Sequence, residues 1–200
     1  MSKILLYGGR GGSAFRPHWM LHELEVAYEN PKLDMRAGEH KQEEFLKINP
    51  NGQVPVLVDG DFVVWESIAI NQYLAEKYKP EMIGTTPEEK GLVTQWSVWS
   101  AYNIHTHLGD LAAPKWTGVE EPAITAKAKK NLERYLPVLN NALEGKDYLV
   151  GNRLTAADIN VCSPLEYSKM VDYDLSAYPN ILRWRTNLES LASYKSAKQE

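Results

Sequence analysis

Cysteine is almost absent from this chain, since Cys162 is the one thiol among 200 residues. A single cysteine cannot form an internal disulfide, and it leaves any cysteine-based metal site short of ligands. Cys162 lies in ADINVCSPLEY, an apolar stretch with helical spacing. We therefore expect a buried structural thiol there rather than a nucleophile.

Long apolar runs and runs of like charge are also missing. No window approaches the about 20 apolar residues of a membrane-spanning helix, and the apolar part of MSKILLYGGR is too short for a signal peptide. The net charge of −4 includes no charged block, so it gives no electrostatic footprint for nucleic acid or an anionic membrane. We expect a cytoplasmic protein that binds neither nucleic acid nor a membrane. Its 44% hydrophobic residues suffice for one large core or two small ones.

The first 80 residues alternate between strand and helix patterns. In chain order these are a strand at 3–7, a helix at 14–28, a weak strand at 32–36, a short helix at 41–49, two strands joined by the DGD turn, and a helix from Ser67 to just before Pro80. This alternation predicts an α/β domain over residues 1–80.

The pattern changes beyond residue 80, where KPEMIGTTPEEK forms a proline-rich, charged connector. Every later periodic segment is helical, with helices predicted at 91–114, 123–145, 156–170 and 180–193. LTAADI predicts a capping box between Thr155 and Asp158, which contributes about 1 kcal/mol to the helix that it starts. We expect an all-α domain over residues 86–200.

The segment NGQVPVL, residues 51–57, places Pro55 at the start of an apolar strand, where its missing N–H would break a sheet ladder. Two explanations are open: a trans proline at a strand start, or a cis bond between Val54 and Pro55. In the second case the backbone groups of Val54 turn outward and can pair with an extended peptide.

Residues 45–78, FLKINPNGQVPVLVDGDFVVWESIAINQYLAEKY, closely resemble the glutathione-binding half of the cytosolic glutathione S-transferases. GNRLTAADI is similar to the helical N-cap signature of the same family. The resemblance implies a thioredoxin-like N-terminal domain of βαβ–α–ββ–α order and a C-terminal helical bundle that supplies the electrophile site. It also implies glutathione as co-substrate without a metal, and a homodimer.

The resemblance carries a set of glutathione contacts onto this chain. They are Gln53, Val54, Pro55, Glu66, Ser67 and His40, with Lys41 as an alternative to His40. By this likeness Pro55 is cis, Val54 pairs its backbone with the cysteinyl unit, and Gln53 supplies an amide contact. Glu66 takes the γ-glutamyl ammonium and Ser67 its carboxylate, which agrees with the affinity of a helix N-terminus for anions. His40 would bind the glycine carboxylate.

The catalytic group must stabilise the thiolate of glutathione. A thiol with a pKa of about 8.5 is roughly 3% ionised at pH 7. The loop YGGRGGSAFRPHW offers two hydroxyls for this task, Ser13 at the expected N-cap of the first helix and Tyr7 at the end of the first strand. We favour Ser13 as the catalytic hydroxyl. Two alternatives remain open: that Tyr7 has this role, or that neither residue has it. Arg16 adds positive charge at the thiol or faces water, and the serine-type S-x-x-S/C pattern is not reproduced.

The electrophile pocket is expected on the first long helix of the second half. Its candidates are Tyr102, Asn103 and His107, beside Trp96 and Trp99. Aromatic residues at this spacing are also typical of a helical core. The HTH sequence does not predict a metal site, because its two histidines point to different helix faces and no carboxylate completes a site.

The leading prediction is therefore a glutathione transferase that conjugates the glutathione thiolate to a soft hydrophobic electrophile. One alternative is a glutathione-dependent disulfide or peroxide reductase, in which Cys162 takes no part. The other is a binding module with the same fold and no turnover.

Overall fold

A three-stranded antiparallel sheet organises the N-terminal part of the computed structural model, which describes residues 3–199. The strands β1 (Ile4–Tyr7), β2 (Val56–Asp59) and β3 (Phe62–Trp65) follow one another in the order β1-β2-β3. β2 and β3 form the predicted hairpin, with Asp59 opposite Phe62. The central strand is the most buried of the three, so the apolar run after Pro55 fills the core as predicted.

The strand predicted at residues 32–36 is wrong. Only Glu29 makes an extended contact at this point, through a single parallel bridge to Leu5. The carboxylate of Asp34 accepts the backbone N–H groups of Arg36 and Ala37, each at 2.9 Å. This side chain offers the backbone a turn in place of a sheet ladder.

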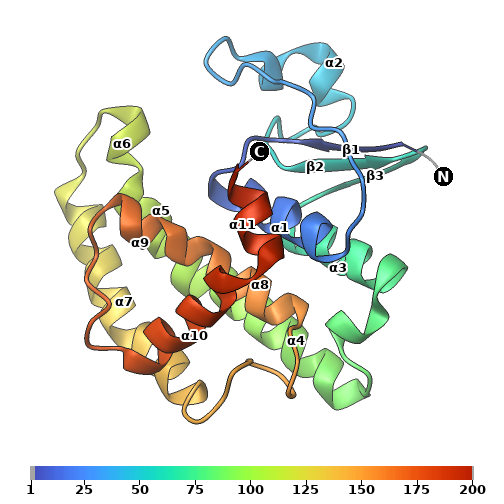
Figure 1. Cartoon of the computed structure of the whole chain (residues 1–200). Coiled ribbons are helices and arrows are strands. Elements are labelled where there is room, and N and C mark those ends of the chain that lie inside the picture. Colours follow the sequence, from blue (N-terminus) through green and yellow to red (C-terminus); the bar gives the residue numbers. More distant parts are fainter. Residues whose placement is uncertain (1–2, 200) are drawn as a thin grey trace. The chain divides into compact units, whose positions relative to one another are not determined.

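Helices cover both faces of this sheet. Figure 1 shows α1 (Phe15–Glu23) and α3 (Ser67–Tyr78) on one face and α2 (Glu43–Leu46) beyond the other. A short 3₁₀ turn, Gly12–Ala14, leads into α1, and another, Glu39–Lys41, precedes α2.

The last helix, α11 (Ala192–Gln199), packs on α1. Tyr194 meets Trp19 and Phe15 edge-on, with ring centroids 5.0 and 5.5 Å apart, and the indole of Trp19 donates to the hydroxyl of Ser193. The chain therefore divides into one unit that ends at Pro80 and takes in the segment from Ala192, and a second unit, Glu81–Leu191. From the sequence this last segment was expected in the helical half.

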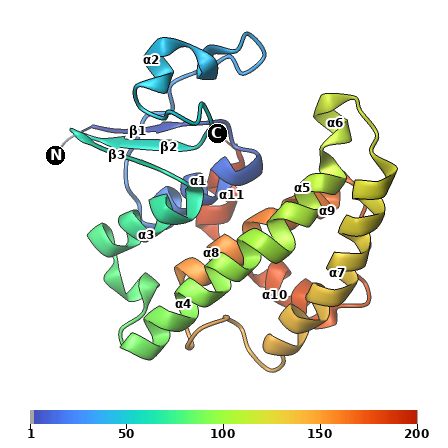
Figure 2. The same ribbon diagram turned by 180° about the vertical axis from the view of Figure 1, so that it is seen from behind.

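The second unit is entirely helical among its regular elements. A 3₁₀ turn, Pro80–Ile83, leads into it, and its helices are α4 (Pro87–Ser100), a π-helical turn (Ala101–His105), α5 (Thr106–Ala112), α6 (Pro114–Thr117), α7 (Pro122–Ala142), α8 (Ala156–Cys162), a 3₁₀ turn (Ser163–Leu165), α9 (Glu166–Met170) and α10 (Pro179–Ser190). Figure 2 shows α4 and α5 as one continuous rod, which was predicted as a single helix. The π-helical turn inside it was not predicted. No helix in the described part of the chain has both the length and the apolar character needed to span a bilayer.

The predicted capping box is present at the start of α8. The fully buried carboxylate of Asp158 accepts the backbone N–H groups of Leu149 and Thr155 and the indole N–H of Trp184. Cys162, at the other end of α8, is buried as expected, and this burial raises the pKa of its thiol.

Candidate functional site

A small cleft of about 60 Å³ brings together most of the residues that the sequence singled out. It is lined by Ser13, Asn49, Asn51, Gln53, Val54, Pro55, Glu66 and Ser67. Three separate segments meet here: the turn before α1, the approach to β2, and the start of α3. Tyr7 and His40 are not among the lining residues.

The floor of the cleft is the segment that leads into β2. The amide of the buried Asn49 donates to the carbonyl of Gln53 at 2.7 Å, and its oxygen accepts the backbone N–H of Asn51 at 3.0 Å. The Val54–Pro55 peptide bond is cis. Within residues 3–199 the backbone N–H and C=O of Val54 make no hydrogen bond. These two groups are therefore available to a ligand backbone, which is how an extended peptide adds to a sheet edge.

One wall of the cleft is the N-terminus of α3. Glu66 precedes the helix with φ of +72°, and its side chain is exposed. Ser67 is the first helical residue and is 5% exposed. The first-turn N–H groups of a helix have no intrahelical partner, so this end carries partial positive charge.

Arg16 adds a full positive charge behind this wall. The side chain lies on α1, is 3% exposed, and donates from Nη1 to the hydroxyl of Ser67 at 3.1 Å. Since that hydroxyl accepts from Arg16, its own hydrogen remains to bind an anion. From the sequence, Arg16 was expected either to add positive charge at the thiol or to face water. No local pattern in the sequence indicated its hydrogen bond to Ser67, which lies 51 residues further along the chain.

Ser13 also lines the cleft, and it lies inside the 3₁₀ turn before α1. The predicted capping role is wrong, because Gly11 precedes that turn and Ala14 precedes α1, and neither cap uses a side chain. Ser13 is half-buried and its hydroxyl makes no hydrogen bond among the described residues. It is therefore a donor without a competing protein acceptor.

Tyr7 takes a different position from Ser13. Its ring meets Phe45 of α2 edge-on, with centroids 5.8 Å apart, on the face of the sheet away from Leu6. This contact is the core packing that was the alternative interpretation of Tyr7.

His40 and Lys41 lie in the 3₁₀ turn beside Gly52. The ammonium of Lys41 donates to the carbonyls of Asn51 and Gly52, at 3.2 and 2.8 Å, so the protein itself uses it. In the part of the chain that the structure describes, the buried Nδ1 of His40 has no hydrogen-bond partner.

The three electrophile candidates differ in their surroundings. Tyr102 is 73% exposed in the π-helical turn, whereas the amide of Asn103 donates to the carbonyl of Trp99. His107 stacks on Tyr135 with the two rings within 5° of parallel. Of the three, Tyr102 is the most exposed, whereas Asn103 and His107 are half-buried.

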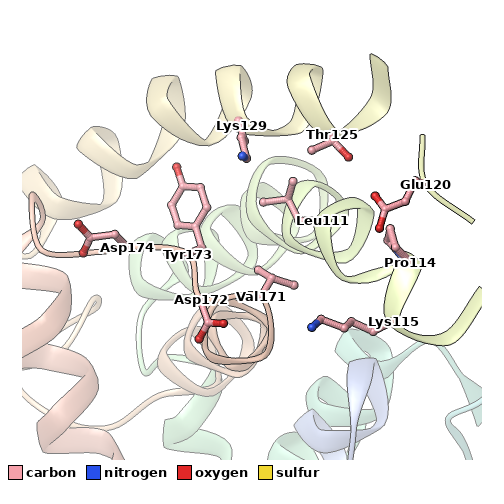
Figure 3. A pocket seen from close by; sticks show the side chains of 10 residues that line it. All are labelled: Leu111, Pro114, Lys115, Glu120, Thr125, Lys129, Val171, Asp172, Tyr173 and Asp174. Atoms are coloured by element: carbon pink, nitrogen blue, oxygen red, sulfur yellow. The ribbon is translucent and has the colours of Figure 1, made fainter. Parts of the chain in front are cut away.

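A larger cleft of about 600 Å³ lies elsewhere in the second unit (Figure 3). Its walls come from α5, α6, α7 and the segment after α9, and it is lined by Leu111, Pro114, Lys115, Glu120, Thr125, Lys129, Val171, Asp172, Tyr173 and Asp174. It contains none of the three electrophile candidates. Charges of both signs surround an apolar floor, so the lining selects no single class of ligand.

Comparisons with known proteins agree over nearly the whole chain. Residues 2–76 match the model of the glutathione S-transferase N-terminal domain, and residues 104–192 match that of the C-terminal domain. Glutathione S-transferase D6 of Drosophila melanogaster is 32% identical over 206 residues, which cover 97% of this chain and 94% of the relative.

Solved structures of glutathione transferases are similar to this one. The glutathione transferase URE2P6 of Phanerochaete chrysosporium, in complex with oxidized glutathione, has a TM-score of 0.88 at 29% identity, over 98% of this chain and 94% of its own. A glutathione S-transferase-I bound with lactoylglutathione has the same TM-score and identity, over 98% of both chains.

Proposed function

The chain belongs to the cytosolic glutathione S-transferase family, and on that premise we propose that it binds glutathione in the cleft beside Val54 and transfers the glutathione thiol to a soft hydrophobic electrophile. The observation that carries this proposal is the meeting of three features in one cleft. They are the open backbone groups of Val54, the buried Ser67 supported by Arg16, and the hydroxyl of Ser13.

Glutathione is held at its two ends and along its backbone. The cysteinyl unit pairs with the N–H and C=O of Val54 as an added strand does. The γ-glutamyl carboxylate accepts from the hydroxyl of Ser67 at the N-terminus of α3, where the helix dipole and the charge of Arg16 both favour an anion. Glu66 neutralises the γ-glutamyl ammonium, and Gln53 contacts the backbone of the peptide.

The glycine end of glutathione extends toward the turn that holds His40. His40 is the proposed contact for the glycine carboxylate, because its turn lies against Gly52, one residue before the cleft residue Gln53. Lys41 acts indirectly, since its ammonium fixes the carbonyls of Asn51 and Gly52.

Catalysis consists of lowering the pKa of the bound thiol. The hydroxyl of Ser13 donates a hydrogen bond to the sulfur and so favours the thiolate. A shift of two units, a differential stabilisation of about 2.7 kcal/mol, makes the thiolate the majority species at pH 7. The thiolate then forms a carbon–sulfur bond with the electrophile, and the leaving group departs with its electron pair. Tyr7 is the second candidate for the donor, although its packing on Phe45 supports a core role.

For the electrophile we propose Tyr102, Asn103 and His107 of the second unit as contacts, of which Tyr102 is the most exposed. We also propose a cytoplasmic homodimer. Exposed apolar side chains on β3 (Phe62 and Trp65) are 47% and 40% exposed, as expected for residues that a second copy covers. Sedimentation equilibrium should give twice the mass of the chain, and a monomer at micromolar concentration would count against the dimer.

The test of the function combines calorimetry with two kinds of substrate. We expect glutathione to bind with one site per chain and an aryl halide to be conjugated. Turnover of a disulfide or peroxide without any aryl halide activity would favour the reductase alternative. No binding of glutathione in calorimetry would favour the non-catalytic module and overturn the proposal.

A further inference from the structure

A group of buried hydrogen bonds lies behind the loop that leads to Ser13. His18, on α1, is fully buried, and its Nε2 lies 2.9 Å from the carbonyl oxygen of Gly8. The amide of Asn30 donates to the same carbonyl at 2.9 Å and to the carbonyl of Leu6 at 2.6 Å. Two side chains from different segments therefore fix one peptide group, at the point where β1 ends and the loop begins.

Gly8 is the residue at which this loop turns toward the cleft. Its φ is +121°, a value that residues with a side chain rarely adopt. A Cβ at Gly8 would lie 3.0 Å from the Cβ of Ala14 and 3.1 Å from the Cβ of Val54. The loop thus passes in close contact with the Val54 floor, and any rotation of the Gly8 peptide changes the position of Ser13 relative to Val54.

The orientation of the His18 ring is itself held in place. A carbonyl oxygen can only accept, so Nε2 of His18 carries the hydrogen in its bond to Gly8. Its Nδ1 lies 2.7 Å from the hydroxyl of Tyr28, and that hydroxyl lies 3.5 Å from Nε2 of His22. Tyr28 therefore fixes the ring plane that aims Nε2 at Gly8.

We propose that His18, aimed by Tyr28 and assisted by Asn30, is a positioning residue for the transfer reaction. It holds the Gly8 carbonyl and so sets the distance between the hydroxyl of Ser13 and the sulfur bound at Val54. It does not touch glutathione. This inference rests on the proposed function, and its physical basis is that a hydrogen bond weakens steeply when its donor moves or tilts.

Two substitutions at His18 separate the aim of this side chain from its bulk. The amide nitrogen of His18→Gln can occupy the position of Nε2 and still donate to Gly8. The shorter His18→Asn side chain can reach only the position of Nδ1. His22→Gln, at the far end of the chain of contacts, is the control and should behave as the parent does.

The readouts are the thiolate absorbance of bound glutathione, titrated with pH, and the pH profile of kcat/KM. His18→Asn should raise the pKa of the bound thiol by about one unit, and lower kcat/KM about fivefold at pH 6.5, where roughly half of the parent's bound thiol is ionised. The KM for glutathione should stay within about twofold of the parent value, because His18 does not contact glutathione. The loss of kcat/KM should vanish near pH 9.5, where the thiol is ionised in both proteins. His18→Gln should keep activity within about threefold of the parent.

The inference is overturned if His18→Asn leaves the thiol pKa unchanged, or if its activity falls by the same factor at every pH, as it would for a variant that is only partly folded. Tyr28→Phe keeps the ring and removes the hydroxyl, so it should shift the pKa in the same direction even if His18→Asn does not fold. No shift in Tyr28→Phe also contradicts the inference. If the parent protein binds no glutathione, both the proposed function and this inference are wrong. If the parent binds and conjugates glutathione and the variants keep its thiol pKa, only this inference is wrong.

Discussion

Replacing Ser67 by alanine tests whether the start of α3 binds the γ-glutamyl carboxylate. The hydroxyl is 5% exposed and already accepts from Arg16 at 3.1 Å, so its hydrogen is the group that the carboxylate meets. A hydrogen bond to a charged group contributes about 1.5–3 kcal/mol, so Ser67→Ala should weaken binding roughly 10- to 100-fold. The helix dipole and Arg16 remain, which is why binding should not be abolished.

The assay is calorimetry with S-methylglutathione, whose blocked thiol removes Ser13 from the comparison. A second ligand carries 4-aminobutyrate in place of the γ-glutamyl unit and so lacks the carboxylate. Parent and Ser67→Ala should bind this second ligand equally, because the missing interaction is the same in both. Ser190→Ala, on the exposed surface of α10, is the control for serine loss. A twofold or smaller effect of Ser67→Ala, or an equal loss for both ligands, would refute the reasoning.

Three further predictions concern stability. Thr155→Ala removes the capping box and should lower the free energy of unfolding by about 1–2 kcal/mol in urea denaturation; a change within error would contradict the role of the cap. Burial raises the pKa of Asp158 to about 6, despite the hydrogen bonds that lower it. Between about pH 4 and pH 6 the folded state therefore keeps a proton on Asp158 that the unfolded state has lost. The free energy of unfolding should consequently fall as the pH rises through this window. The free energy of unfolding of the parent, relative to that of Asp158→Asn, should therefore drop by roughly 2–3 kcal/mol across that window. A relative stability that increases with pH would contradict a raised pKa for Asp158. Gly52→Ala should lower the free energy of unfolding by about 1–2 kcal/mol in urea denaturation, because φ at Gly52 is +57° and the added Cβ would lie 2.8 Å from the carbonyl oxygen of His40. Gly91→Ala is the control: its Cβ would lie in open space, so this change should be neutral or stabilising.

Elements whose stabilising partners are close in sequence could be predicted from the chain. The β2–β3 hairpin, the helix that begins at Ser67 and the capping box at Thr155 each depend on residues within a few positions of one another. The cleft residues Gln53, Val54 and Ser67 were instead indicated by the resemblance of residues 45–78 to the glutathione S-transferases, and the structure brings them into one cleft.

Features that depend on distant contacts could not be predicted. The role of Arg16 follows from a contact with Ser67, and α11 joins the first unit through Tyr194 and Trp19. The miss at residues 32–36 is local instead: the residue pattern predicted a strand, but the side chain of Asp34 accepts the backbone N–H groups of Arg36 and Ala37 and forms a turn. The apolar spacing of this stretch also did not predict the π-helical turn inside the rod of α4 and α5.

The proposed catalysis depends most on Ser13 as the hydroxyl that stabilises the thiolate over the Val54 floor. A pH titration of the thiolate absorbance of bound glutathione, made on the parent, Ser13→Ala and Tyr7→Phe, measures this directly. We predict that Ser13→Ala raises the thiol pKa by at least about one unit and that Tyr7→Phe leaves it near the parent value. An unchanged pKa in Ser13→Ala together with a raised one in Tyr7→Phe would contradict it.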